Sequence, residues 1–186
     1  IYQDIAFGPG NLGCSEDEID ERVKWACEMV DLDFERVKEV SPFDVSGGQK
    51  RRAAIAGVLA MKPKFLVLDE PTAGLDPKGR DEILNNINNL YQEENMTIIL
   101  VSHSMEEIAR LVNRIVVLEH GEILMDGKPK EIFSRHEELR QIGLDVPQIT
   151  ELMIKLREKG MDIPTDVLTV EEAELVLKEY LRRSKC

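Results

Sequence analysis

Three short apolar runs constrain the fold of this chain most strongly. They cover residues 65–68, 97–101 and 114–118, and none shows the apolar–polar alternation of a strand with one wet face. Such runs are typical of strands buried on both faces of a sheet. Helical patterns separate them, so the connections predict right-handed crossovers and a parallel sheet. After the third run, the turn E-H-G-E at residues 119–122 predicts a hairpin with residues 123–125. The sequence therefore predicts an α/β fold.

Composition narrows the class of protein. The chain has 186 residues, of which 42% are hydrophobic, and its 24 basic and 36 acidic residues give a net charge of −12. An acidic surplus argues against broad nucleic-acid binding, which needs a basic face. Three cysteines, Cys14, Cys27 and Cys186, share no metal-ligand spacing. We expect them to be free thiols in a reducing cytosol.

The two ends of the chain differ from its middle. Residues 1–14 contain three glycines and a proline before residue 14, which predicts extended chain followed by a loop. Near the other end, apolar stripes predict helices at about 147–159 and 169–183. We expect those stripes to pack on the main body or on a partner. Trp25 and the acidic helix around it are either an ordinary solvated helix or a docking surface.

A pair of carboxylates follows the first apolar run. Asp69 and Glu70 come directly after the predicted strand F-L-V-L, and ligands of open α/β sheets bind at the carboxyl ends of strands. At a nucleoside triphosphate, Asp69 can hold Mg²⁺, directly or through water. Glu70 can then polarise an attacking water as general base. The alternative is a solvated pair of loop residues.

A glycine-rich segment, S-G-G-Q-K-R-R, opens a predicted helix upstream of the acid pair. It contains Ser46, Gly47, Gly48 and Gln49. Glycines let a phosphate approach the backbone, and a helix N-terminus supplies free N–H groups with a partial positive charge. The alternative is a flexible turn before a helix.

Two further segments complete the pattern. A-G-L-D, which ends at Asp76, follows the acid pair, and His103 follows the second apolar run. A histidine after a strand is often structural, but His103 is expected at the same sheet edge as Glu70, where it could donate to a phosphate oxygen.

These four segments, in this order, resemble the nucleotide-binding subunit of ABC transporters over about residues 40–125. S-G-G-Q-K-R-R resembles the family signature, F-L-V-L-D-E the Walker B strand with its catalytic glutamate, A-G-L-D the D-loop, and His103 the switch histidine. The segments D-I-A-F-G-P-G-N-L-G, A-I-A-G-V-L-A-M and G-L-D-V-P-Q-I-T are similar to the ATPases of energy-coupling factor transporters. That subfamily imports vitamins or transition-metal ions such as cobalt.

The resemblance implies a domain organisation. Residues 1–136 would be the C-terminal portion of an ABC ATPase domain with part of a P-loop NTPase-type parallel sheet. Within it, residues 1–60 would form the helical signature region and residues 61–136 the core with Walker B, D-loop and switch histidine. Residues 137–186 would be a helical C-terminal appendage.

The resemblance also implies the mechanism. Two ATPase subunits would enclose ATP and Mg²⁺, with Ser46, Gly47, Gly48 and Gln49 serving the partner's nucleotide and Asp69, Glu70 and His103 the subunit's own. Asp76 would cross the interface between the subunits. A membrane scaffold and substrate-binding membrane components would complete the importer, and the segment around residues 1–45 would dock on them. The ATPase would lie at the cytoplasmic face of the cell membrane.

The sequence departs from the family in one respect: it has no G-x-x-x-x-G-K-[ST] phosphate loop. Its nearest approach, residues 8–15, carries Cys14 where the lysine should be and precedes an acidic helix. We therefore expect a family member without its N-terminal phosphate-binding part, inactive alone. The alternatives are a noncatalytic dimerisation and docking module, and a soluble ABC ATPase of DNA repair or translation.

Overall fold

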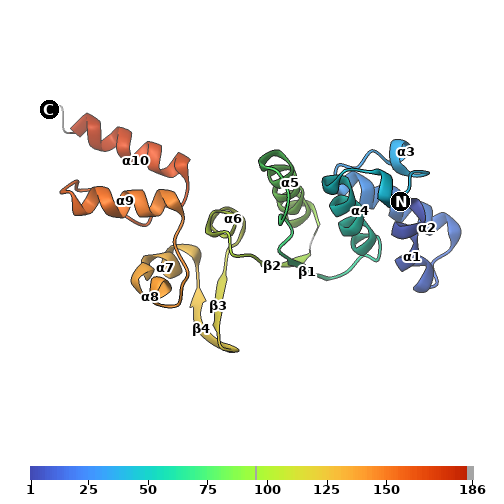
Figure 1. The fold of residues 1–186 in the computed structure, drawn as a ribbon, viewed down its shortest axis with the longest axis horizontal. Coiled ribbons are helices and arrows are strands. Elements are labelled where there is room, and N and C mark those ends of the chain that lie inside the picture. Colours follow the sequence, from blue (N-terminus) through green and yellow to red (C-terminus); the bar gives the residue numbers. More distant parts are fainter. Residues whose placement is uncertain (95, 184–186) are drawn as a thin grey trace. The chain divides into compact units, whose positions relative to one another are not determined.

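A computed structural model describes residues 1–94 and 96–183. It is a mixed α/β structure with a parallel strand pair and many helices, as predicted. The chain divides by its contacts into two compact units, Ile1–Val101 and Ser102–Cys186. Figure 1 draws the first from blue to green and the second from yellow-green to red.

The first unit begins with five helical segments and continues with two strands that are separated by a helix. Its elements are α1 (Tyr2–Asn11), α2 (Glu16–Met29), α3 (Phe34–Val37), the 3₁₀ helix η1 (Pro42–Asp44), α4 (Gly47–Leu59), β1 (Phe65–Asp69), α5 (Pro77–Glu93) and β2 (Thr97–Val101). The longer helices start at polar caps that the sequence displays. The Ser15 side chain accepts a hydrogen bond from the Glu18 backbone N–H, and Asp76 does the same for Gly79. Such caps satisfy donors that a helix start leaves unpaired.

The N-terminal segment is helical, so the prediction of extended chain over residues 1–14 is wrong. Helix α1 packs against α2 and α4 and contains Pro9, which is fully buried. Gly8 makes room for Met61, because a Cβ there would lie 2.7 Å from Cγ of Met61 and that side chain would have to shift. Tertiary contact therefore overrides the weak helix propensity of glycine and proline.

Strands β1 and β2 pair in parallel, with Val67 opposite Ile99 and Asp69 opposite Val101. The prediction that β1 is buried on both faces is wrong. Leu66 is buried, whereas Val67 is 60% exposed. Among residues 1–94 and 96–183, β1 has β2 as its only strand neighbour, and the apolar cluster of the first unit covers one face.

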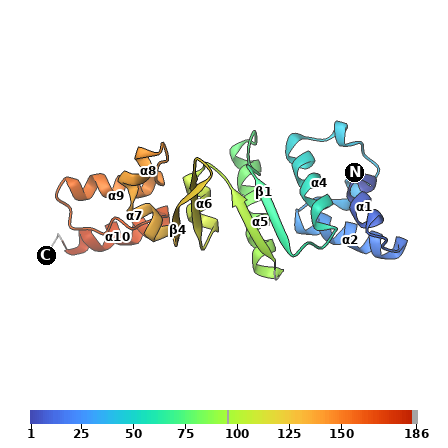
Figure 2. The same ribbon diagram turned by 90° about the horizontal axis from the view of Figure 1, so that it is seen from below.

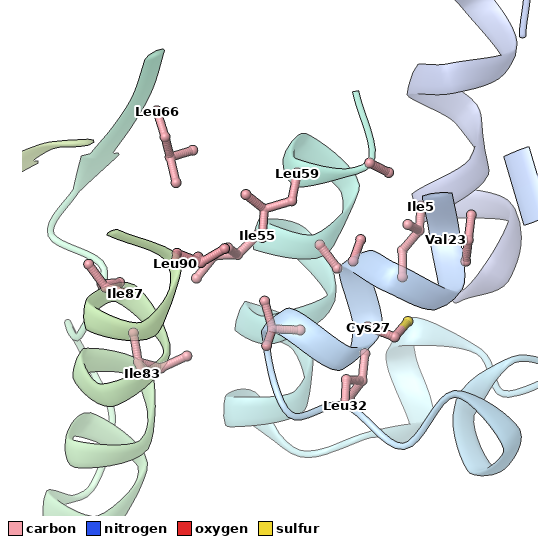
Figure 3. Close-up of a cluster of buried hydrophobic side chains, with 14 of the residues drawn as sticks. Ile5, Val23, Cys27, Leu32, Ile55, Leu59, Leu66, Ile83, Ile87 and Leu90 are labelled. Atoms are coloured by element: carbon pink, nitrogen blue, oxygen red, sulfur yellow. The ribbon is translucent and has the colours of Figure 1, made fainter. Parts of the chain in front are cut away.

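That cluster joins the helices to β1. It includes Leu66 of β1, Ile55 and Leu59 of α4, and Leu90 of α5. Figure 3 shows Ile55 and Leu90 on the facing sides of their two helices. Cys27 lies in the same cluster as a free thiol, and burial raises its pKa to about 11. The free-thiol prediction therefore holds for Cys14 and Cys27, while Cys186 lies outside the described residues.

The second unit contains a hairpin and five helices among its described residues. Its elements are α6 (Met105–Leu111), β3 (Ile115–Glu119), β4 (Glu122–Gly127), α7 (Pro129–Ser134), α8 (His136–Gln141), α9 (Gln148–Glu158) and α10 (Val170–Arg183). Figure 2 shows the same elements from below. The division by contacts thus groups the hairpin with the tail helices; the boundary after residue 136 stays a prediction.

The third apolar run is a strand, but it is not a buried strand of the parallel sheet. β3 pairs antiparallel with β4, and Leu118 is 66% exposed. The turn between them explains the pairing: His120 and Gly121 both have positive φ, at 49° and 83°. Two consecutive residues of this kind form the turn that closes tight antiparallel hairpins.

The tail helices α9 and α10 pack on one another around a small apolar cluster. Met153, Ile163, Val167 and Ala173 form its buried part. The Thr150 hydroxyl, also buried, donates to the backbone carbonyl of Val167 at 2.5 Å. Within the described part of the chain, every helix is too short or too polar to cross a membrane.

Adjacent residues of α9 provide a test of this packing. Met153 is fully buried and Leu152 is 44% exposed. Met153→Asp should lower the free energy of unfolding by more than about 3 kcal/mol, because it buries an unpaired charge. Leu152→Asp should lower it by only about 1 kcal/mol, because this side chain is partly exposed. Urea unfolding followed by circular dichroism measures both, and equal losses would contradict this assignment of the buried face.

Candidate functional site

The acid pair lies where β1 ends. Asp69 is the last residue of the strand, and its side chain is exposed. The Glu70 N–H donates to the Val101 carbonyl at 2.9 Å, which extends the parallel pairing by one residue. Glu70 then turns the chain with a φ of 45°. A non-glycine residue with positive φ is uncommon, so the surrounding structure must hold this conformation.

A compact turn connects the acid pair to α5. The Ala73 N–H donates to the Glu70 carbonyl at 3.1 Å, and Thr72 is buried within the turn. Gly74 adopts a φ of 76°, which favours glycine. At the end of the turn the Asp76 carboxylate accepts a hydrogen bond from the Gly79 N–H at 2.9 Å. Asp76 therefore caps α5; its role at a subunit interface stays a prediction.

The predicted glycine-rich segment forms the start of α4. Ser46 is the N-cap: its hydroxyl accepts from the Gln49 N–H at 3.2 Å, and the Gln49 side chain accepts from the Ser46 N–H at 3.0 Å. This reciprocal pair is a capping box. It fixes the direction of the first helical turn, and the Ser46 hydroxyl keeps its own proton to donate.

Gly47 and Gly48 have no role in packing. A Cβ built on either of them meets no described atom within 4 Å, and neither has a positive φ. This differs from Gly8, whose missing side chain makes room for Met61. The open space in front of Gly47 and Gly48 suits close approach of an external group to the backbone of a helix N-terminus.

Two arginines that the motifs do not mark as functional extend from α4, Arg51 to the acid pair and Arg52 to α5. The Arg51 guanidinium donates to backbone carbonyls at the end of β1. Arg52 forms an ion pair with Glu82 of α5, with Nη1 and Oε2 2.8 Å apart. Both arginines are present in S-G-G-Q-K-R-R. The sequence could not reveal the partners of Arg51, because they are backbone carbonyls, which every residue has.

His103 belongs to the second unit and is exposed just before α6. Its neighbours are ordered: the Ser102 hydroxyl donates to Oε2 of Glu107 at 3.0 Å, and the Ser104 hydroxyl accepts from the Glu107 N–H. Within the first unit, by contrast, the helix that begins at Ser46–Gln49 is linked to Asp69 and Glu70, because its Arg51 side chain bonds their backbone carbonyls. The predicted meeting of His103 with Glu70 stays a prediction.

The residues present are chemically suited to Mg²⁺. Protein-bound Mg²⁺ is held by one or two carboxylates, with water and substrate phosphates completing its shell. Asp69 and Glu70 provide such oxygens at one strand end. The described residues contain no cluster of three or more His, Cys, Asp or Glu side chains.

Half of the segment 8–15, which falls closest to a phosphate-loop pattern, is helical. Gly8–Asn11 belong to α1, and the N–H groups of Leu12, Gly13 and Cys14 donate to carbonyls within the same turn. In a phosphate loop such N–H groups point at the ligand instead.

Comparisons with known proteins define the class. The family model "AAA domain, putative AbiEii toxin, Type IV TA system" matches residues 2–109, more than half of the chain. The chain therefore belongs to the AAA-domain family.

Its relatives are more specific. Over 99% of its length it is 55% identical to the energy-coupling factor transporter ATP-binding protein EcfA2 of Clostridium perfringens, and over 100% it is 56% identical to that of Clostridioides difficile. It spans 65% of the length of each. The resemblance to energy-coupling factor ATPases is confirmed.

Solved structures agree. cbiO1 of Clostridium perfringens, described as part of the ABC transporter complex cbiONQ, matches with a TM-score of 0.66 and 41% identity, over 82% of this chain and 60% of that one. A putative metal-chelate type ABC transporter matches with a TM-score of 0.68 over 76% of this chain and 56% of that one. Because its sequence is only 22% identical, this match supports the fold alone.

Two glycines test whether the start of α4 is free of packing constraints. Gly48→Ala should leave the free energy of unfolding unchanged or raise it by up to about 1 kcal/mol, because alanine is the better helix former and meets no atom. Gly74→Ala, at φ 76°, should lower it by about 1 kcal/mol. Urea denaturation measures both, and a loss in Gly48→Ala as large as in Gly74→Ala would show that Gly48 is structural.

Proposed function

We propose that this chain is part of the ATP-binding and ATP-hydrolysing subunit of an energy-coupling factor type ABC importer, which powers uptake of a vitamin or a transition-metal ion. The observation that carries the proposal is a helix N-terminus with two unobstructed glycines, connected through Arg51 to a carboxylate pair at a strand end. The first feature suits a phosphate and the second a magnesium-bound nucleotide. The names of the relatives support transport rather than a soluble ABC ATPase.

In the proposed mechanism, each residue keeps the role that the resemblance implies. Asp69 would hold the Mg²⁺ of the bound ATP, Glu70 would polarise the attacking water, and His103 would donate to a phosphate oxygen. Ser46 and the backbone of Gly47 and Gly48 bind the nucleotide of the second ATPase subunit, with Gln49 beside them. Asp76 connects the two sites across the interface.

The proposed assembly is a dimer of ATPase subunits at the cytoplasmic face of the cell membrane, bound to a membrane scaffold and substrate-binding membrane components. The similar protein cbiO1 is described as part of the ABC transporter complex cbiONQ, which supports a role in a transporter complex. The surface around residues 1–45 is proposed as the docking face, and residues 137–186 as the C-terminal appendage of domain 1–136.

A second candidate function is a noncatalytic dimerisation and docking module. The sequence favours it in one respect, because it contains no G-x-x-x-x-G-K-[ST] segment. The first candidate requires Glu70 for ATP hydrolysis, whereas the second involves no hydrolysis. Separate experiments below test the role of Glu70 and the binding of ATP.

The general-base role of Glu70 can be tested in the full-length protein. Glu70→Gln should lower ATP hydrolysis by about 10²–10⁴-fold, since it keeps size and hydrogen bonding but removes the base. Filter binding should show ATP still bound. The control Glu93→Gln, an exposed carboxylate on α5, should leave hydrolysis unchanged. Unaltered hydrolysis in Glu70→Gln would exclude Glu70 as the base.

A separate experiment tests the 186-residue chain by itself. We expect no tight binding of Mg-ATP, because the lysine-containing loop that normally contacts the β- and γ-phosphates is missing from this sequence. Isothermal titration calorimetry measures this directly. A micromolar dissociation constant, about −8 kcal/mol, would contradict the expectation and draw attention back to residues 8–15.

A further inference from the structure

The Arg51 guanidinium binds the backbone at the end of β1. Its Nε donates to the Pro71 carbonyl at 2.9 Å. Its Nη2 donates to the Glu70 carbonyl and, at 3.4 Å, to the Asp69 carbonyl. One side chain from α4 therefore contacts three consecutive carbonyls, including those of both acidic residues. We propose that Arg51 is a positioning residue, which holds the turn that presents Asp69 and Glu70.

The turn needs such a contact because of its conformation. Glu70 has a φ of 45°, so β1 ends abruptly there. Buried or half-buried carbonyls require hydrogen-bond partners, and a charged donor forms stronger bonds than a neutral one. Pro71 is fully buried, so its carbonyl lies in a confined part of the structure. Arg51 therefore both provides a hydrogen-bond donor for this carbonyl and stabilises the unusual turn.

The shape of the guanidinium matters. It is planar and carries several N–H donors at fixed angles, whereas a lysine ammonium is a compact charge on a flexible stem. Nε and Nη2 address different carbonyls at once. Lysine could replace one of these hydrogen bonds, but not the set. The structure therefore predicts graded effects, with lysine between arginine and an apolar residue.

Arg51 also connects the two halves of the proposed site. It lies two residues after Gln49, on the first turns of the helix that Ser46 caps. Its neighbour Arg52 ties the same helix to α5 through Glu82. Consecutive arginines thus attach α4 to both sides of the turn between β1 and α5. A displacement of the start of α4 would therefore also move the acid pair, because Arg51 bonds its backbone. The catalytic part of this inference rests on the proposed function.

Hydrogen exchange tests the structural part in the 186-residue chain. Arg51→Met keeps the apolar stem and removes the donors. The amide of Glu70 bonds to the Val101 carbonyl where β1 ends, and the amide of Ala73 bonds to the Glu70 carbonyl within the turn. Both should exchange about tenfold faster, equivalent to about 1.4 kcal/mol. Arg51→Lys should give a smaller increase. The amide of Ala60, bonded to the Ala56 carbonyl at the end of α4, should not change.

A matched control removes a charge from the neighbouring residue. Lys50 is exposed on the same helix, so Lys50→Gln should leave the exchange of Glu70 and Ala73 as in the parent chain. Equal exchange in Arg51→Met and the parent would overturn the proposal. If Arg51→Met also accelerates exchange of the Ala60 amide, the helix itself has loosened, and Arg51→Lys becomes the deciding variant. Unchanged exchange at Glu70 and Ala73 in Arg51→Lys would then overturn the proposal.

Single-turnover ATP hydrolysis by the full-length dimer tests the catalytic part. Arg51→Met should slow hydrolysis at least tenfold at saturating ATP, with ATP affinity within about twofold, because a misplaced base costs rate rather than binding. In the Glu70→Gln background, Arg51→Met should add little, since a residue acting through Glu70 has no further effect once the base is gone. Independent, multiplicative effects would overturn the positioning role. Absence of hydrolysis by the parent dimer would instead reject the proposed function, and the exchange result would stand by itself.

Discussion

Shared burial in one apolar cluster is the interaction on which the first unit depends. A single apolar cluster contains Ile55 and Leu59 of α4, Leu66 of β1 and Leu90 of α5. Such burial is favourable by about 25 cal/mol per Å² of apolar surface, but it is not directional. The direction comes from polar contacts at the rim of the same interface, where Arg51 and Arg52 bind groups on either side of the acid-pair turn. Apolar packing brings the elements together, and the arginines fix their register.

Local signals in the sequence predicted many of these elements. The helices at Ser15, Ser46 and Asp76 begin at caps whose side chains bond the backbone three residues on. Such signals act within one turn and need no tertiary information. Both strands of the parallel pair were also predicted. The same holds for the acid pair, because its position follows from where β1 ends.

Non-local features were predicted poorly, for physical reasons. Helix α1 forms despite Gly8 and Pro9 because it packs on α2 and α4. The apolar run at residues 115–118 does not reveal that it lies outside the parallel sheet, although the hairpin that follows it, with its turn at His120 and Gly121, was predicted correctly. The run in β1 does not reveal how many faces will be covered. Arg51 escaped notice because its acceptors are carbonyls, which every residue has.

The glycines show how structure separates a functional position from a structural one. Gly8 is explained by Met61, and Gly74 by its φ of 76°. Gly47 and Gly48 have neither explanation, although helix interiors disfavour glycine. Under the proposed function, these glycines, at a helix start whose cap bonds are complete, leave room for a phosphate to approach the backbone. The proposed positioning by Arg51 would then connect that helix start to the two carboxylates, because the same side chain bonds the backbone of Asp69 and Glu70.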